Sequence, residues 1–307
     1  MYKVLESAGS MAMAFTPSTG EVYGYQKSIG SVYERLSRGS YGIGILKSVD
    51  SGLTWKKSLD WTYQQQRGVL CLRINPLNPK VVFAGTSEGV YKSTDAGVNW
   101  VQAHSVLMAV DIAFKPGDTT VMYVSCGNLG SNGMGVYRSL NSGAAGSFQK
   151  LGGGLPGNWT GKTMLAVCPD RPNALYADIG NDTSTLGLYY SGDQGSAWTL
   201  RNDSNYAGVQ GWFSHYVRPH PQNCENLMIG GQHYYRSNDG GRTIYVVGGQ
   251  WPNNTLHLDH HAFANSPVDM KTIYIGHDGG VSRTRDGGET FESMKQGYVT
   301  TQCYPGF

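Results

Sequence analysis

The residues of this chain whose types could do chemistry gather toward its C-terminal end. His257, Asp259 and His261 occupy alternate positions, and His277 and Asp278 follow a short way on. Alternate residues of a β-strand share a face, so we expect the first three side chains to line up along the innermost strand of their sheet. Such a cluster can form a polar core network, bind a ligand, or hold a divalent metal. No established metal motif matches the spacing, so we predict no metal and no cofactor.

Aromatic residues mark a second candidate site in the stretch from Gln210 to Tyr216. Trp212 could stack on a sugar ring or could pack between sheets. Trp159 and Lys162 occupy the comparable place one repeat earlier. A long insertion from Gln26 to Tyr41 is a further recognition element, because long loops on rigid scaffolds often carry binding function.

A turn motif repeated six times sets the architecture that must position these residues. Its cleanest copy runs from Ser48 to Trp55 and reads S-x-D-x-G-x-T-W. The copies begin at Ser48, Ser93, Ser139, Ser191, Ser237 and Thr284. A period of about 46 residues, with four short strands in each unit, is typical of the blades of a β-propeller.

The motif has the chemistry of a turn rather than that of a reaction. A short acidic or amide side chain accepts backbone N–H bonds, and the Gly two residues later adopts a positive φ. The hydroxyl at the first position adds a local bond, and the closing Trp, Phe or Ile suits a seam between blades. We therefore predict structural roles for Asp50, Asp95, Asn141, Asp193, Asp239 and Asp286.

Each repeat reads as strand, Pro turn, strand, short loop, strand, motif turn and strand, and no window has a helical period. We predict an all-β chain, a single β-propeller domain over residues 1–307 with six complete four-stranded blades. The predicted blades cover residues 8–60, 67–103, 105–151, 160–201, 209–248 and 256–297. Residues 1–7 and 298–307 are predicted as terminal strands of a possible seventh blade. They either close the ring together or mark this chain as part of a longer protein.

Composition narrows the classes of partner. The formal net charge is +2 and no Lys/Arg run occurs, which gives no electrostatic basis for binding nucleic acid. No apolar stretch approaches the roughly 18 residues of a membrane span. The five cysteines are scattered without a C-x-x-C pair. We expect them to be buried small apolar side chains, since an odd count argues against a complete disulfide framework.

The six turns resemble the Asp-box (BNR) repeats of sialidases, sortilin-type receptors, xyloglucan hydrolases and many secreted bacterial propeller proteins, and are most similar to the last group. The resemblance rests on Gly42–Lys47, Gly230-Gly231, and His257–His261 with Gly276–Gly280. Gln302-Cys303-Tyr304 looks like the opening strand of a next blade. The resemblance covers nearly the whole chain and implies a propeller fold, an extracellular or cell-surface location and a longer parent protein.

Catalytic patterns are weak in this chain. Glycoside hydrolysis usually needs two carboxylates placed across a cleft. Outside the turns the best placed are Asp111, Asp178, Asp259 and Asp278, which sequence alone does not pair. No nucleophile elbow, zinc-protease helix motif or phosphate-binding loop occurs.

We therefore expect a non-enzymatic extracellular binding or structural scaffold that presents propeller loops to a glycan or protein partner. One alternative is a glycoside hydrolase of the xyloglucan-hydrolase kind that uses Asp259 or Asp278. Another alternative is a subunit of an extracellular assembly or homo-oligomer, joined by strand addition.

Overall fold

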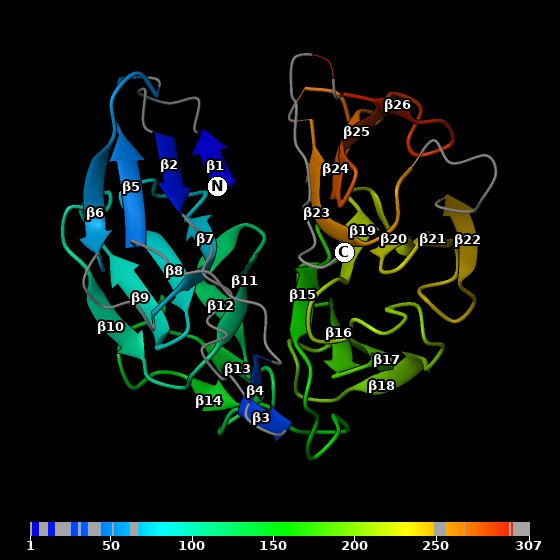
Figure 1. Cartoon of the computed structure of the whole chain (residues 1–307), viewed down its shortest axis with the longest axis horizontal. Coiled ribbons are helices and arrows are strands. Elements are labelled where there is room, and N and C mark those ends of the chain that lie inside the picture. The colour runs from blue at the N-terminus through cyan, green and yellow to red at the C-terminus, as the bar shows by residue number, and fades with distance from the viewer. Residues whose placement is uncertain are drawn as a thin grey trace. The chain divides into compact units, whose positions relative to one another are not determined.

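The computed structural model describes residues 44–50, 52–61, 67–248, 256–266, 268–294 and 296, together with the backbone pairing of four strands nearer the N-terminus (Figure 1). All regular structure in these residues is β-strand, which confirms the predicted all-β class. The chain divides into two compact units, Met1–Leu165 and Ala166–Phe307, and each unit is described by itself.

Unit 1 contains three four-stranded sheets and a separate hairpin. The sheets have the strand orders β1-β2-β5-β6, β10-β9-β8-β7 and β11-β12-β13-β14, and β3 pairs with β4 alone. The strands are β1 Tyr2–Leu5, β2 Ala12–Phe15, β3 Gln26–Ile29, β4 Val32–Arg35, β5 Gly44–Ser48, β6 Lys56–Asp60, β7 Val69–Ile74, β8 Val82–Thr86, β9 Gly89–Ser93, β10 Val101–His104, β11 Ala109–Lys115, β12 Asp118–Cys126, β13 Gly135–Ser139 and β14 Gln149–Lys150.

The three remaining sheets are antiparallel meanders and lie in unit 2, except that the first residues of β15, up to Leu165, belong to unit 1. Their strand orders are β15-β16-β17-β18, β19-β20-β21-β22 and β23-β24-β25-β26. The strands are β15 Thr163–Val167, β16 Leu175–Asn181, β17 Ser184–Ser191, β18 Thr199–Asn202, β19 Tyr216–His220, β20 Asn223–Gly230, β21 Tyr234–Ser237, β22 Tyr245–Gly248, β23 His260–Asn265, β24 Ile273–His277, β25 Gly280–Thr284 and β26 Glu292–Ser293.

Burial falls across these sheets from the inner strands to the fourth strand. Every residue of β8 is buried, whereas most residues of the fourth strands β10, β18 and β22 are exposed or partly exposed. A strand covered on both faces needs a near-continuous apolar or small sequence, such as Val82–Thr86 of β8. This gradient is that of propeller blades. Five four-stranded blades lie entirely within the fully described residues, from β7–β10 to β23–β26.

The N-terminal strand pairs differently from the prediction. Residues 1–7 are predicted to end a preceding blade, but β1 pairs with β2 inside the first sheet, with Tyr2 opposite Phe15. The reason is the insertion after β2. Its segments Gln26–Ile29 and Val32–Arg35 pair with each other as a hairpin outside the first sheet, and that sheet takes its first strand from Tyr2–Leu5.

Other parts of the prediction are not tested by the described residues. The predicted strand at 298–307 lies outside them. Only β5 and β6 of the first sheet have described side chains. The count of six complete blades with a seventh begun, and the single domain over residues 1–307, therefore stay predictions.

Apolar clusters fill the seams between neighbouring sheets within each unit. In unit 1, Ile45 and Leu72 belong to one cluster, and Trp100 packs against it. In unit 2, Tyr176 and Val217 belong to another, and Ile244 packs against it. Trp100 and Ile244 close the second and fifth copies of the turn motif, so the predicted apolar plug in the seam is confirmed for these copies.

The repeated turn is closed by hydrogen bonds within the motif itself. In the first copy Ser48 Oγ donates to Asp50 (2.7 Å) and accepts from the Gly52 N–H (2.8 Å), and the Thr54 N–H donates to Asp50 (2.8 Å). Corresponding bonds close the copies at Asp95, Asp193, Asp239 and Asp286. The first hydroxyl residue of all six copies is at most 1% exposed. These bonds support the structural role predicted for the carboxylates.

The third copy, with Asn141 in place of the carboxylate, closes differently. Ser139 Oγ lies 2.7 Å from Ser147 Oγ and accepts the Gly143 N–H at 3.1 Å. A second hydroxyl therefore bonds to the first one where a carboxylate does so in the other copies.

Acid should weaken the fold through the turn carboxylates. The Thr54 hydroxyl, and then the Thr54 N–H, lower the pKa of Asp50 to about 2, and the Ala197 N–H lowers the pKa of Asp193. A folded pKa below the unfolded one gives stability that is present above about pH 4 and is lost as the pH falls toward 2. We expect the urea midpoint of unfolding to fall over that range.

The matched variants are Asp50→Asn in the turn and Asp203→Asn at an exposed position outside the turns. Asp50→Asn should lower the midpoint at pH 6 and flatten its decline below pH 4, whereas Asp203→Asn should leave the decline unchanged. Equal declines in wild type and Asp50→Asn would contradict this account.

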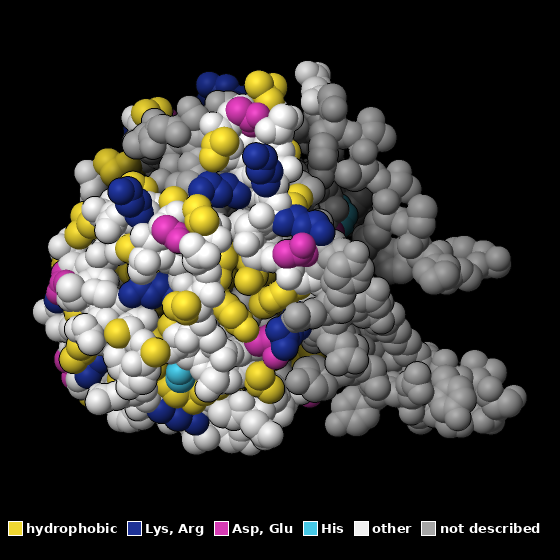
Figure 2. Space-filling view, turned by 90° about the vertical axis from the view of Figure 1, so that its left-hand side faces the viewer, with side chains coloured by type: hydrophobic (Ala, Val, Ile, Leu, Met, Phe, Trp, Pro, Cys, Tyr) yellow, Lys and Arg dark blue, Asp and Glu magenta, His cyan; other side chains and the backbone are white. Residues whose placement is uncertain are grey.

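The described surface mixes side chains of different kinds. On the face in Figure 2, Lys and Arg side chains are interspersed with Asp, Glu and apolar ones, which fits the small net charge of +2. Within the described residues, no helix is long and apolar enough to cross a membrane.

Candidate ligand-binding site

Strand order gathers the candidate residues of unit 2 at one end of its sheets. In an antiparallel meander the start of the first strand and the link between the second and third strands lie at the same end. The Pro turns and repeated turns lie at the other end. The segments preceding β19 and β23 therefore share an end with the β24–β25 link. Ser214 Oγ, just before β19, donates to the His260 carbonyl at 2.8 Å and joins the two blades there.

A close polar contact joins two of the predicted site residues. His261 Nε2 lies 2.6 Å from Asp278 Oδ1. His261 belongs to β23 and Asp278 to the β24–β25 link. Their side chains are 19% and 26% exposed, so the pair is accessible to a ligand from solvent.

Asp259 lies before β23, not within it. Its φ is +61°, and the strand begins only at His260. A residue in the left-handed region redirects the chain, so the alternation of a strand does not extend back through it. The prediction that His257, Asp259 and His261 share one strand face is therefore wrong.

Asp259 nevertheless joins the same group of residues. Its Oδ1 accepts a hydrogen bond from Gln210 Nε2 at 2.7 Å. Burial, and then the nearby Asp278 carboxylate, raise the pKa of Asp259, while His261 and His257 act in the opposite sense. Two carboxylates and an imidazole thus lie close enough to influence one another's charge.

Three more histidines pack together beside this group. The His257 and His277 rings stack with centroids 6.0 Å apart, and His260 meets His277 edge-on at 5.8 Å. His277 Nε2 lies 2.8 Å from Ser282 Oγ. His260 is fully buried, neither ring nitrogen has a hydrogen-bond partner among the described residues, and burial lowers its pKa to about 3. His260 is therefore neutral near pH 7. Strict alternation along a strand assigns His260 to the face opposite His257 and His261, so the sequence pattern does not indicate it as a site residue.

Trp212 brings an aromatic surface to the same place. Its ring stacks on Phe213 at 4.9 Å between centroids, and Phe213 meets the His261 ring edge-on at 4.7 Å. Both aromatic side chains are partly exposed. We call Trp212, Phe213, Asp259, His261 and Asp278 the aromatic–carboxylate cluster. The two stretches that the sequence singled out separately lie in contact with each other.

Asp178 and His215 form a buried hydrogen-bonded pair that the sequence did not predict. Asp178 Oδ2 is 2.8 Å from His215 Nδ1, and the Tyr206 hydroxyl donates to Asp178 Oδ1 at 2.6 Å. All three side chains are at most 1% exposed. The sequence offered Asp178 only as a candidate catalytic carboxylate. Its burial removes it from contact with a substrate.

The metal alternative has little geometric support. Among the described residues, three ligand atoms of His, Cys, Asp or Glu lie within 4.8 Å of one another only at Cys168, Asp170 and Cys224. There the two sulfurs are joined as a disulfide. The candidate residues His257, Asp259, His261, His277 and Asp278 thus do not form such a group.

The candidates of unit 1 are largely structural. Asp111 is fully buried and accepts hydrogen bonds from Arg73 (2.5 Å), the Leu165 N–H (3.0 Å) and the Ile112 N–H (3.0 Å). Trp159 is 4% exposed, so it packs in the interior rather than facing a ligand.

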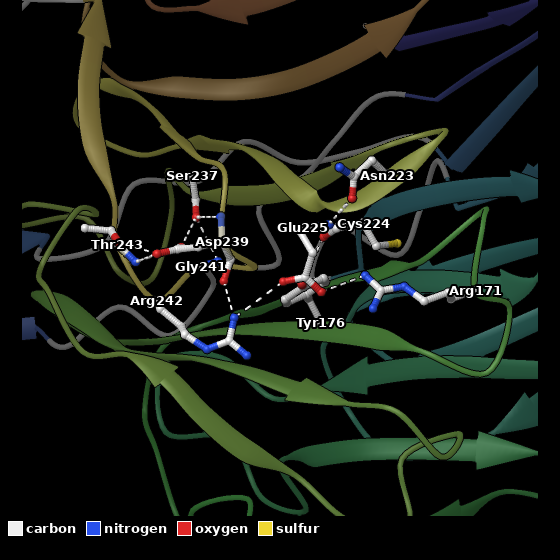
Figure 3. Close-up of polar contacts among 10 residues, drawn as sticks. All are labelled: Arg171, Tyr176, Asn223, Cys224, Glu225, Ser237, Asp239, Gly241, Arg242 and Thr243. Atoms are coloured by element: carbon white, nitrogen blue, oxygen red, sulfur yellow. Dashed lines mark hydrogen bonds and ion pairs between the residues drawn. The ribbon is translucent and has the colours of Figure 1, made fainter.

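At the opposite end of unit 2, ion pairs and a hydrogen bond link two neighbouring blades (Figure 3). Glu225 lies between Arg171 (2.9 Å) and Arg242 (3.5 Å), and the Tyr176 hydroxyl donates to the Cys224 carbonyl at 3.0 Å. Cys224 forms a disulfide with Cys168, 56 residues earlier. This corrects the expectation of free cysteines.

Among the described cysteines, Cys168 and Cys224 are the two that differ from the expectation. Cys71 and Cys126 are buried and free, as expected, and Cys303 lies outside the described residues. Cys168 and Cys224 pair because the turn after β15 and the strand β20 bring their Cα atoms to 5.7 Å, a long-range contact without a local sequence signal.

Solved structures that resemble the chain are β-propeller proteins. An ancestral GH74 enzyme matches with a TM-score of 0.60 and 20% identity, covering 75% of this chain and 31% of that one. YCF48 bound to a D1 peptide matches with a TM-score of 0.53 and 13% identity, covering 82% and 77%. An auxiliary nutrient binding protein from Bacteroides ovatus matches with a TM-score of 0.51 and 14% identity, covering 74% and 57%.

These likenesses show the propeller fold and nothing finer, because every identity is low. The chain spans 31% of the length of the GH74 enzyme. No family model and no curated protein sequence matches the chain.

Proposed function

We propose that this chain is a non-enzymatic binding propeller that recognises a neutral glycan through the aromatic–carboxylate cluster. The observation that carries the proposal is the stacked pair of Trp212 and Phe213, partly exposed and in contact with the His261–Asp278 pair. An aromatic face packs on the apolar face of a sugar ring. Carboxylate, imidazole and amide groups beside it can bond to the hydroxyls of that ring.

The charges of the cluster indicate which class of glycan fits. Asp278 is paired with His261, and Asp259 bonds to the neutral Gln210 amide. An anionic sugar would bring a like charge next to both carboxylates, which disfavours binding. A neutral, hydroxyl-rich polysaccharide fits better than a uronic acid polymer.

The second candidate function is glycoside hydrolysis, and one observation favours it. The raised pKa of Asp259 is a property that a general acid needs. However, the Asp278 N–H bonds to the Asp259 carbonyl at 3.2 Å, so the two residues are backbone neighbours. Glycosidases place their two carboxylates on either side of the bond that they cleave. This arrangement favours binding over cleavage.

The wider biological setting is part of the same proposal. A disulfide between Cys168 and Cys224 suits an oxidising compartment, which supports an extracellular or cell-surface location. The turn bonds described above support placing the chain among the Asp-box propellers. The neighbours named for a bound peptide and for nutrient binding leave a protein partner as the alternative to a glycan.

The test is binding to a panel of neutral polysaccharides (xyloglucan, xylan, mannan and β-glucan), with pectate and alginate as anionic comparisons. We expect Trp212→Ala to weaken binding of the best neutral ligand about tenfold or more, because a stacked aromatic side chain contributes roughly 1.5–3 kcal/mol. Isothermal titration calorimetry measures the change.

The matched control is Tyr245→Ala, since Tyr245 is an aromatic residue that is 43% exposed on β22 and outside the cluster. It should bind as wild type does. Preference for the anionic polymers, or equal affinity of wild type and Trp212→Ala, would overturn the proposal. Release of reducing ends would instead establish the hydrolase alternative.

A further inference from the structure

A buried chain of hydrogen bonds leads from β16 to the backbone of the segment that carries Trp212. The Asp178 carboxylate holds His215 Nδ1 at 2.8 Å, and His215 Nε2 lies 3.0 Å from the Gly211 carbonyl oxygen. Asp178 is 0% exposed and His215 is 1% exposed. Neither side chain belongs to the aromatic–carboxylate cluster.

Both partners of the His215 ring are hydrogen-bond acceptors. A neutral imidazole carries a single N–H, so it can satisfy only one of them. The arrangement is satisfied when each ring nitrogen carries a proton, with the Nδ1 proton shared with the carboxylate. Asp178 also accepts the Tyr206 hydroxyl, and burial raises the pKa of Tyr206 well above its usual value, so that hydroxyl remains a donor.

The backbone around Gly211 leaves no room for a side chain at Gly211 or at Gly180. A Cβ atom on Gly211 would lie 2.1 Å from the carbonyl oxygens of Asn181 and Ser184. A Cβ atom on Gly180 would lie 2.1 Å from the Gly211 oxygen and 2.9 Å from His215 Nε2. The segment is therefore pressed against the β16–β17 link, and the imidazole holds its carbonyl in place.

The held segment carries much of the proposed glycan site. Gln210 donates to Asp259, and the Phe213 N–H and Ser214 N–H donate back to the Gln210 carbonyl, each at 2.9 Å. Phe213 contacts His261. A shift of Gly211 would therefore move the aromatic pair and the Gln210 amide together.

We propose that His215 and Asp178 are positioning residues that lock the segment Gln210–Ser214 in its ligand-binding form. In this lock the His215 imidazolium is paired with the buried Asp178 carboxylate and donates a hydrogen bond from Nε2–H to the Gly211 carbonyl. Holding a site in its bound form lowers the entropy lost on binding. This inference rests on the proposed glycan-binding function, but its first test does not.

The first test uses the free wild-type protein. Long-range ¹H–¹⁵N spectra of the histidine rings should show protons on both nitrogens of His215 at pH 7. His215→Phe, which keeps a ring of similar shape, should shift the Trp212 indole N–H resonance. A neutral His215 tautomer, or an unmoved Trp212 resonance in a folded His215→Phe protein, would overturn the inference.

The matched control is Tyr216→Phe, on the residue that follows His215 and begins β19. The Tyr216 hydroxyl is buried and has no hydrogen-bond partner among the described residues, so its removal should leave the Trp212 resonance in place. Should His215→Phe fail to fold, the wild-type spectrum alone decides, because a neutral His215 contradicts the lock.

The second test measures affinity for cellohexaose as a neutral glycan probe. We expect His215→Phe to bind about tenfold more weakly than wild type and Tyr216→Phe to bind equally well. Equal binding by all three proteins would overturn the lock while leaving the glycan site intact. No binding by any of them, together with a doubly protonated His215, would count against the glycan and not against the lock.

Discussion

Replacing Asp111 with Ala should lower the free energy of unfolding by about 3 kcal/mol. The carboxylate is fully buried and accepts hydrogen bonds from Arg73 and from the Ile112 and Leu165 N–H groups. Removing one partner of a buried ion pair costs roughly 3–5 kcal/mol, because it leaves a charge without compensation. Arg73 is 36% exposed and can be partly hydrated, which puts the expected loss at the lower end.

Equilibrium urea unfolding at pH 7 measures this loss. Asp111→Asn keeps an acceptor for one of the two backbone N–H groups and should fall between wild type and Asp111→Ala. Asp118→Ala is the control, because Asp118 is 41% exposed on the next strand and solvent screens its pair with Lys115, so its loss should be much smaller. Equal losses for Asp111→Ala and Asp118→Ala would contradict the structure.

The double variant Cys168→Ala/Cys224→Ala should lower the free energy of unfolding by about 4 kcal/mol. The disulfide closes a loop of 56 residues, and loop closure in the unfolded chain predicts roughly that figure. Dithiothreitol should destabilise wild type by a similar amount and leave the double variant unchanged.

Cys71→Ala is the control, because Cys71 is a buried free cysteine in unit 1. It should keep the full response to dithiothreitol. Peptide mapping without reductant should recover Cys168 linked to Cys224. Alkylation of both residues in the native protein would show that the bond does not form.

Features that depend on a few neighbouring residues were predictable from the sequence. The bonds of Asp50 to Ser48 and Thr54 span at most four positions, so all the residues that form them lie within the motif. The Trp100 plug follows from the same spacing. Local chemistry repeated at a constant period thus predicts the turns and the all-β class.

Long-range choices were not predictable from a single sequence. The pairing of β1 with β2 depends on whether the intervening insertion joins the sheet, which no local signal decides. The disulfide likewise depends on how two blades pack. In the site, His261 and Asp278 were found, but the left-handed backbone of Asp259 broke the alternation on which the predicted face rested. The role of His215 was not predictable because it depends on a contact with Asp178, which belongs to another blade.

The central claim is that a neutral glycan binds at the aromatic–carboxylate cluster. The most direct measurement is a titration of ¹⁵N-labelled protein with the neutral oligosaccharide that binds best in the polysaccharide panel. We predict that the Trp212 indole N–H and the His261 ring shift together, saturating with the dissociation constant found by calorimetry. Shifts confined to residues away from this cluster, or saturation without any change at Trp212, would contradict the account.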